Sequence, residues 1–397
     1  MAVLSAVAVA LGAWAMPGAA SASASAGAPS HTQADAAHAV TSYDALQKYL
    51  YVGDGSYLYH EQYPVQPKDN KYSYEWPFSQ AHVATLDLVG IGGRTGASFG
   101  PALRDRSAGQ ERYWNAAGGT TGVPGYDSYA PAPYGGGGDM FYDDNEWVGL
   151  EKAQQFLMTG DRTALARAKQ VFALVVSGWD TDATHADPGG VFWTQASWSQ
   201  DRNTVSNMPG AELGLRLYQA THDRTYLDWA KRMYDWTNRY LLAPNGMYWD
   251  HVSLVAGPPV TVTVEKTQWS YNQGVPIGVD VLFYEVTHDP TYLQRAESVA
   301  QASYQYFVEQ GNLSGQPPYF NSIYFKNLLL LESVTGGTKY RQAMQNYADT
   351  TWTTLRDPAS GLFQFAGNGE TQAIEQAAMV QIYATLAWPA SRDQLLY

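Results

Sequence analysis

Residues 221–230 read Thr221-His-Asp-Arg-Thr-Tyr-Leu-Asp-Trp-Ala230, and variants of this phrase recur from Thr159, Thr287 and Thr335. In each copy a Thr or Asp suited to cap a helix follows an apolar stretch and opens an amphipathic one. Each copy is therefore interpreted as a turn between two helices, the first more apolar than the second.

The helices before these turns are rich in Leu, Val, Gly and Ala and poor in charge, so we expect them to be buried on most sides. They cover residues 144–158, 204–220, 274–286 and 322–334, and two further candidates cover 78–89 and 371–387. Charged outer partners are expected near 42–51, 104–113, 165–177, 226–241, 292–309 and 340–355. This alternation predicts an all-α fold, an (α/α)6 barrel or toroid of six inner and six outer helices. An open solenoid would show a more regular period.

Long loops rich in Gly, Pro and aromatic residues interrupt the repeats at 92–140 and 244–268. Loops on one face of a scaffold commonly carry function. The second loop contains Pro258-Pro-Val-Thr-Val-Thr-Val264, which we expect to form a short hairpin strand. His222 and His288 occupy equivalent repeat turns and are interpreted as turn or capping residues rather than ligands.

The first 40 residues differ from the rest in composition. An apolar run at 2–16 followed by small residues is typical of a secretory signal peptide, although no Lys or Arg precedes the run. We expect a signal peptide over 1–26, a disordered linker over 27–40, and a single domain over 41–397 of a secreted protein. The chain has no cysteine, which excludes disulfides and thiolate chemistry.

The overall charge favours a neutral partner. The formal net charge is −13, whereas nucleic-acid binding needs a basic patch. Tyr and Trp are abundant, at 29 and 13 residues, and such side chains stack on sugar rings through an apolar face. We expect a monomer that binds a polysaccharide or oligosaccharide, with no nucleic acid, no stable membrane insertion, no metal and no cofactor.

Polar residues gather where the inner helices begin. The starts read Tyr142-Asp-Asp-Asn-Glu-Trp147, Arg202-Asn-Thr-Val-Ser-Asn207, Trp269-Ser-Tyr-Asn-Gln273 and Phe320-Asn-Ser322, with Gln372, Glu375 and Gln376 at the last one. Inner helices of a toroid run parallel, so these starts should meet at one end of the ring. Buried charges are costly unless paired or functional. The topology therefore predicts a pocket of acids, amides and aromatics.

The adjacent carboxylates Asp143 and Asp144 are the candidate catalytic residues. Glycosidic cleavage needs one proton donor and one nucleophile or base. Neighbouring side chains can approach about 5–5.5 Å, the separation that favours retention of anomeric configuration. Acidic residues in a first turn also stabilise a helix, so spacing alone leaves open whether the pair is catalytic or capping.

Several segments together resemble glycoside hydrolase family 76, the endo-α-1,6-mannanases. The resemblance runs from about Trp76 to Trp388. It rests on Trp76-Pro-Phe-Ser-Gln80, Tyr142-Asp-Asp-Asn-Glu-Trp147, Pro188-Gly-Gly-Val-Phe-Trp193, Asn203-Thr-Val-Ser-Asn207, Tyr271-Asn-Gln-Gly274 and Glu375-Gln-Ala-Ala378. It implies an (α/α)6 fold and retaining cleavage of α-1,6-mannosidic linkages.

The resemblance also implies roles. Asp143 would be the nucleophile and Asp144 the general acid/base. Sugar binding is expected of Tyr142, Asn145, Trp147, Trp193, Asn203, Asn207, Asp250, Tyr271, Asn272 and Gln273. Glu146 is a departure, because it places a third acid beside the pair, either facing outward or tuning the site.

Three alternatives remain open at this stage. A mannan transglycosylase of the same family would pass the covalent intermediate to a sugar instead of water. A sugar epimerase on an α/α toroid would need inner-face histidines, whereas the histidines here fall mainly in loops and repeat turns. A non-catalytic carbohydrate-binding toroid would not need the intact Asp143–Asp144 pair.

Overall fold

The computed structural model describes residues 31–255, 257 and 261–397. The expected signal peptide at 1–26, residues 27–30 of the expected linker, and the Pro258-Pro-Val260 part of the expected hairpin strand lie outside the described residues. The rest of the linker prediction is wrong. Residues 31–40 are the first half of helix α1 (His31–Leu50), which buries Asp35 and Ala39 and so is held by tertiary packing.

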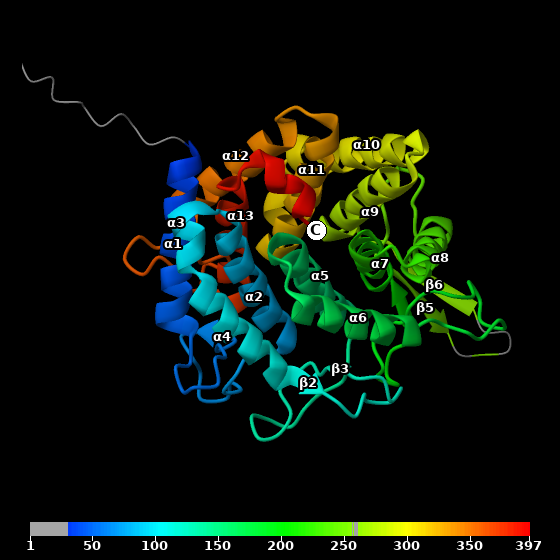
Figure 1. Cartoon of the computed structure of the whole chain (residues 1–397), viewed down its shortest axis with the longest axis horizontal. Coiled ribbons are helices and arrows are strands. Elements are labelled where there is room, and N and C mark those ends of the chain that lie inside the picture. Colours follow the sequence, from blue (N-terminus) through cyan, green and yellow to red (C-terminus); the bar gives the residue numbers. More distant parts are fainter. Residues whose placement is uncertain (1–30, 256, 258–260) are drawn as a thin grey trace, which may run out of the picture.

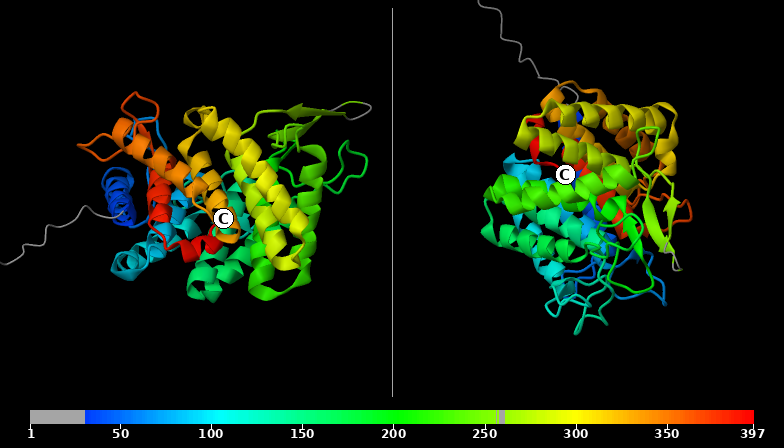
Figure 2. Two further views of the ribbon diagram at one scale, coloured as in Figure 1. Left: turned by 90° about the horizontal axis from the view of Figure 1, so that it is seen from above. Right: turned by 90° about the vertical axis from the view of Figure 1, so that its right-hand side faces the viewer.

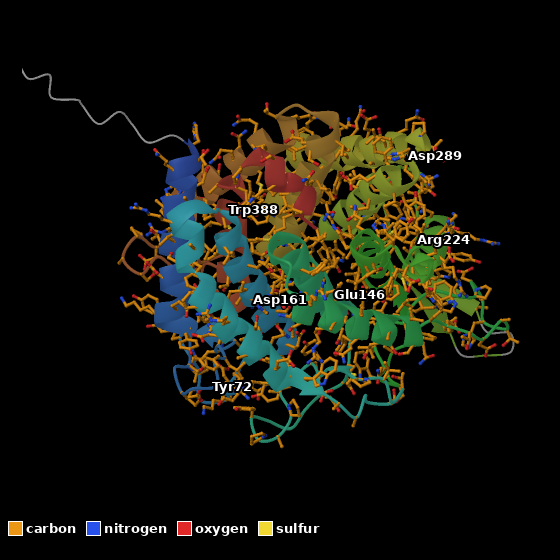
Figure 3. The ribbon with its side chains drawn as sticks, in the orientation of Figure 1. Tyr72, Glu146, Asp161, Arg224, Asp289 and Trp388 are labelled. Atoms are coloured by element: carbon orange, nitrogen blue, oxygen red, sulfur yellow. The ribbon has the colours of Figure 1, made fainter. Side chains whose placement is uncertain are left out.

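The repeated phrases form the predicted turns. Asp161, Asp223 and Asp289 are the N-caps of α6 (Arg162–Ser177), α8 (Arg224–Tyr240) and α10 (Pro290–Tyr304). Each aspartate accepts a hydrogen bond from the backbone two residues later, which satisfies an otherwise unpaired N–H group. Figure 3 shows Asp161 and Asp289 at the starts of their helices.

The structure confirms that His222 and His288 are turn residues. They are the C-caps of α7 (Met208–Thr221) and α9 (Tyr271–Thr287) and adopt left-handed conformations with φ of 58° and 57°. The backbone N–H of each donates to a carbonyl four residues earlier, which ends the helix before the turn.

Among the described residues, six helices form an inner ring and six form an outer one, as the repeats predict (Figure 1). The inner ring is α2 (Glu75–Gly90), α5 (Tyr142–Thr159), α7, α9, α11 (Pro318–Thr335) and α13 (Ala373–Leu386). Each inner helix packs against the next, and α13 packs against α2, so the ring closes. The outer helices are α1, α4 (Gly100–Gln110), α6, α8, α10 and α12 (Lys339–Thr354). The all-α barrel prediction is confirmed.

Short strands and a small helix stand between the barrel helices. They are α3 (Gly93–Ser98), β1 (Gln62–Tyr63), β2 (Trp114–Asn115), β3 (Gly125–Tyr126), β4 (Asp201–Asn203), β5 (His251–Val255), β6 (Thr261–Glu265) and β7 (Thr371–Gln372). β5 and β6 form the expected hairpin, and β4 extends it on the β5 side. The hairpin projects beyond the helices (Figure 2). The helix expected from residue 204 begins at Met208, because residues 204–206 form a 3-10 turn closed by Ser206.

The C-terminal ends of the inner helices meet opposite these strands, and residues 390–397 lie across them (Figure 1). Arg216 on α7 donates hydrogen bonds to the carbonyls of Gln394 and Leu396. Near this end of the ring, Lys326 on α11 forms an ion pair with Asp87 on α2. Lys326 Nζ lies 2.7 Å from Asp87 Oδ2, and both side chains are buried. Within the described part of the chain, no helix is long and apolar enough to cross a membrane.

We predict that Lys326→Met destabilises the protein by about 3–5 kcal/mol, because removal of one partner leaves a buried carboxylate uncompensated. The matched control is Lys231→Met, which removes the exposed Lys231–Asp235 pair on α8. That pair is screened by water and should contribute far less. Urea unfolding at pH 7 compares the two variants. Equal losses of unfolding free energy in the two variants would show that the buried Asp87–Lys326 pair stabilises the protein no more than the exposed pair does.

Candidate active site

The first turns of the inner helices surround a cavity of about 280 Å³. Its lining mixes acids, an amide and aromatic side chains from α2, α5, α9, α11 and the intervening loops. The lining residues are Trp76, Asp143, Asp144, Trp147, Trp193, Asp201, Asn203, Val205, Asp250, His251, Tyr271 and Phe320. The predicted pocket therefore lies where the parallel helices place it.

Asp143 stands in the first turn of α5, and its Oδ2 accepts a hydrogen bond of 3.1 Å from the Trp193 indole. Burial by the surrounding protein raises the pKa of Asp143 to about 7, and the negative charge of Asp250 adds to this rise. The hydrogen bonds from Trp193 and from first-turn backbone N–H groups act in the opposite direction. Asp143 therefore changes charge near neutral pH, unlike an ordinary aspartate.

Asp144 is also shifted toward its protonated form. Burial raises its pKa well above the ordinary value, and the charges of Asp143 and Glu75 raise it further. Glu75 is the first residue of α2, is fully buried, and accepts a hydrogen bond from Gln110. Burial raises the pKa of Glu75 to about 8. These carboxyls cannot all be ionised together, so near neutral pH the site retains protons.

Glu146 does not face outward. It is fully buried on α5 and points toward α7, where a Cβ added to Gly210 would lie 2.9 Å from its Oε1 (Figure 3). Burial and the charge of Asp143 raise the pKa of Glu146 well above its ordinary value. The third acid beside the pair is thus a buried core residue whose protonated form is favoured.

Aromatic rings form the walls of the cavity. The rings of Tyr271 and Phe320 are stacked, with centroids 3.9 Å apart and an interplanar angle of 4°. Trp193 packs edge-to-face against Phe141 and against the exposed Trp198. Such flat apolar surfaces beside carboxylates suit a sugar, whose C–H faces stack while its hydroxyls form hydrogen bonds.

Another cavity, of about 480 Å³, adjoins the first. The two share Trp76, Asp144 and Trp193, and the larger one does not include Asp143. Its remaining lining residues are Glu61, Tyr74, Pro77, Ser128, Asp139 and Phe141. Asp144 therefore lies between two cavities that a chain molecule could occupy together.

Seven of the twelve residues expected at the site line the smaller cavity: Asp143, Asp144, Trp147, Trp193, Asn203, Asp250 and Tyr271. The other five are not among its lining residues, and their sugar contact stays a prediction. They are Tyr142, Asn145, Asn207, Asn272 and Gln273. Tyr142 is buried with its ring against Gly178, where an added Cβ would lie 2.5 Å away.

Each amide among these five forms at least one hydrogen bond within the protein. Asn145 exchanges hydrogen bonds with the backbone of Tyr126, Gln273 with that of Tyr248, and Asn207 with that of Val191. Asn272 donates to Asp250 Oδ1 at 2.9 Å. These hydrogen bonds hold loops and a carboxylate in place.

Five cavity residues were not expected from the sequence: Trp76, Asp201, Val205, His251 and Phe320. Trp76 stands in a segment that carries the family resemblance, and Phe320 opens a helix start already considered, so a signal for both was present. Asp201 and His251 are brought together by pairing between β4 and β5. Among the described residues, no group of three or more His, Cys, Asp or Glu could hold a metal ion.

Known structures share this architecture. The family 76 mannosidase Bt3792 of Bacteroides thetaiotaomicron VPI-5482 aligns with a TM-score of 0.78 at 24% identity, over 89% of this chain and 98% of that one. An inactive variant of the α-1,6-mannanase GH76A of Salegentibacter sp. HEL1_6, with two consecutive aspartates replaced by asparagine, was solved with α-1,6-mannotriose. It aligns with a TM-score of 0.70 at 18% identity, over 89% of this chain and 99% of that one.

Sequence comparison gives the family directly. The mannan endo-1,6-alpha-mannosidase DCW1 of Candida glabrata is 32% identical over 143 residues, which are 34% of this chain and 31% of that protein. The chain thus matches less than a third of that relative's length. The profile of glycosyl hydrolase family 76 matches residues 107–372, which include the Asp143–Asp144 pair. The chain belongs to glycosyl hydrolase family 76.

Proposed function

We propose that this protein is an endo-acting α-1,6-mannanase that retains anomeric configuration, with Asp143 as nucleophile and Asp144 as general acid/base. The position of Asp144 between two cavities, with Asp143 facing only the smaller one, carries the proposal. A double displacement needs one carboxylate at the anomeric carbon and one carboxylic acid at the leaving oxygen. This arrangement offers both.

The electrostatics of the pair support the division of roles. Burial raises the pKa of Asp143 to about 7, and burial together with the charge of Asp143 raises the pKa of Asp144 well above its ordinary value. Because the two carboxyls repel each other when both are ionised, one can attack as a carboxylate while the other supplies the proton that the leaving oxygen requires. The Trp193 indole holds the attacking carboxylate by its Oδ2.

Each cavity then binds a different part of the substrate. The smaller cavity, with Asp143, takes the sugar that becomes attached to the enzyme, and the larger one takes the leaving part. Binding on both sides of the scissile bond suits attack within a chain, as in the mannan endo-1,6-alpha-mannosidases among the relatives. The complex of a family member with α-1,6-mannotriose supports the same substrate class.

Transfer to a sugar acceptor is the second candidate, because the larger cavity could hold an acceptor as well as a leaving group. Product sizing with added α-1,6-mannobiose separates the two, since only a transglycosylase gives products longer than the substrate as its main output. We also propose that the protein acts outside the cell. Cell fractionation that finds the protein only in the cytoplasm would contradict this proposal.

We predict that Asp143→Asn and Asp144→Asn each lower kcat on linear α-1,6-mannan by at least about 10³-fold, because each removes one of the two chemical groups. Asp235→Asn on the exposed face of α8 is the matched control and should retain wild-type activity. Reducing-end release measures the rates, and thermal melting checks folding. Full activity in either cavity variant would refute the assignment.

We predict that the first-formed product of wild-type cleavage is the α-anomer. Two successive displacements at the same carbon restore the starting configuration. Proton NMR of the anomeric signals during the first minutes of reaction distinguishes the anomers before mutarotation mixes them. A β-anomer formed first would require direct attack by water and would remove the nucleophile role from Asp143.

We predict that Glu146→Gln flattens the dependence of stability on pH. Burial raises the pKa of Glu146 in the folded protein, so its contribution to stability is complete below the ordinary pKa of a glutamate and is lost as pH rises through the folded pKa. Glutamine carries no such proton, so the free energy of unfolding of the variant should rise relative to that of wild type as the pH increases above the ordinary pKa of a glutamate. Urea unfolding measures this, with Glu297→Gln on the exposed face of α10 as control. An unchanged slope would show that Glu146 is already ionised.

A further inference from the structure

The sheet formed by β4, β5 and β6 has two chemically different faces. Its register places Asp201 opposite Ser253 and Ser253 opposite Thr263, and it places Asn203 opposite His251 and His251 opposite Glu265. Paired residues share a face and neighbours along a strand alternate. One face therefore carries these polar side chains near the barrel, with Val255 and Thr261 paired on it at the outer end of the hairpin.

The other face anchors the sheet to the barrel. Val252 is fully buried against Trp236 and Leu241, and Val264 packs against the same cluster. Leu254 and Val262 are paired on this face farther along the hairpin. Because the apolar face is covered, the polar face is the one free to meet a ligand.

The polar face continues the wall of the smaller cavity. Asp201, Asn203 and His251 line that cavity together with Asp143 and Asp144. Ser253 lies two residues beyond His251, which is about 6.6 Å along a strand. The face thus leads away from the nucleophile, along the side that would hold the non-leaving part of the chain.

On this face, His251 Nε2 and Asp201 Oδ2 are available as a hydrogen-bond donor and acceptor for a ligand. His251 Nδ1 lies 2.9 Å from Asp250 Oδ2, whereas His251 Nε2 lies 4.0 Å from Asp201 Oδ2, too far for a hydrogen bond. Ser253 donates to the other oxygen of Asp201 and fixes that carboxylate. Burial lowers the pKa of His251, but the hydrogen bond with Asp250 and the charges of Asp250, Asp201 and Glu265 raise it above its ordinary value.

We propose that His251 and Asp201, continued by Ser253 and Thr263, form a distal subsite for a mannosyl unit on the non-leaving side of the substrate. An α-1,6-linked chain leaves the 2-, 3- and 4-hydroxyls of each unit free. One hydroxyl can accept from His251 Nε2 while its neighbour donates to Asp201 Oδ2, which matches a donor and an acceptor 4.0 Å apart. This inference rests on the proposed function.

The test compares short and long substrates. His251→Asn keeps an amide able to bond Asp250 but removes the Nε2 donor, and Asp201→Asn removes the charged acceptor. We expect each variant to lower kcat/KM on α-1,6-mannohexaose by about tenfold, the effect of one lost hydrogen bond to a charged group. The loss on α-1,6-mannobiose, which fills only the two positions beside the scissile bond, should be smaller, so the hexaose-to-biose ratio of kcat/KM should fall.

A matched control removes packing from the opposite face of the same sheet. Val262→Ala loosens the hairpin without touching the polar face and should leave the hexaose-to-biose ratio unchanged. A ratio that falls equally in Val262→Ala would overturn the subsite in favour of general loosening. An unchanged ratio in both polar variants, or equal losses on both substrates, would overturn it as well. Failure of wild type on every α-1,6-mannan would instead refute the proposed function.

Discussion

The inner helices run in the same direction around a closed ring, and this constraint brings their amino-terminal turns to one end of the barrel. Each first turn leaves backbone N–H groups without helical partners and carries the positive end of the helix dipole. Carboxyl groups placed there gain from that field but lose the solvation of water. For Asp143, Asp144 and Glu75 the loss dominates, because burial is the largest influence on each pKa and every shift is upward. The ring therefore creates both a cavity and a set of acids that keep protons near neutral pH.

The same end of the barrel uses amides to hold its loops. Asn145, Gln273, Asn321 and Gln376 each stand in the first turn of an inner helix, and each bonds the backbone of a segment outside that helix. A short polar side chain that meets backbone donors and acceptors satisfies groups that would otherwise be buried unpaired. The rim is thus rigid where the loops meet the helices, which fixes the positions of Trp193 and Asp250 relative to Asp143. Binding and bracing are carried out by different residue types at neighbouring positions.

This division explains what the sequence could and could not predict. The helices and their turns follow from local periodicity and from caps such as Asp223, which depend on residues a few positions apart. The site end of the barrel follows from the parallel direction of the inner helices. The roles of Asn145, Asn207 and Gln273 did not follow, because their partners lie 16 to 25 residues away, in segments whose path local periodicity does not determine. His251 and Asp201 were missed for a related reason, since only the β4–β5 register brings them together. The linker prediction failed because composition does not report that Ala39 packs into the core.

Asp250 lies between Asn272 and His251 in the wall of the smaller cavity. Its Oδ1 accepts from Asn272 and its Oδ2 faces His251 Nδ1, so both oxygens are held while the carboxylate lines the cavity. The charge of Asp250 raises the pKa of Asp143, which keeps the proposed nucleophile protonated to a higher pH. A positive charge on His251 offsets part of that effect, because it stands against the same carboxylate. A sugar bound at His251 would exclude water from this pair and strengthen its interaction. Asp250 therefore connects the polar face of the sheet to the proposed nucleophile, because it contacts His251 and its charge acts on Asp143.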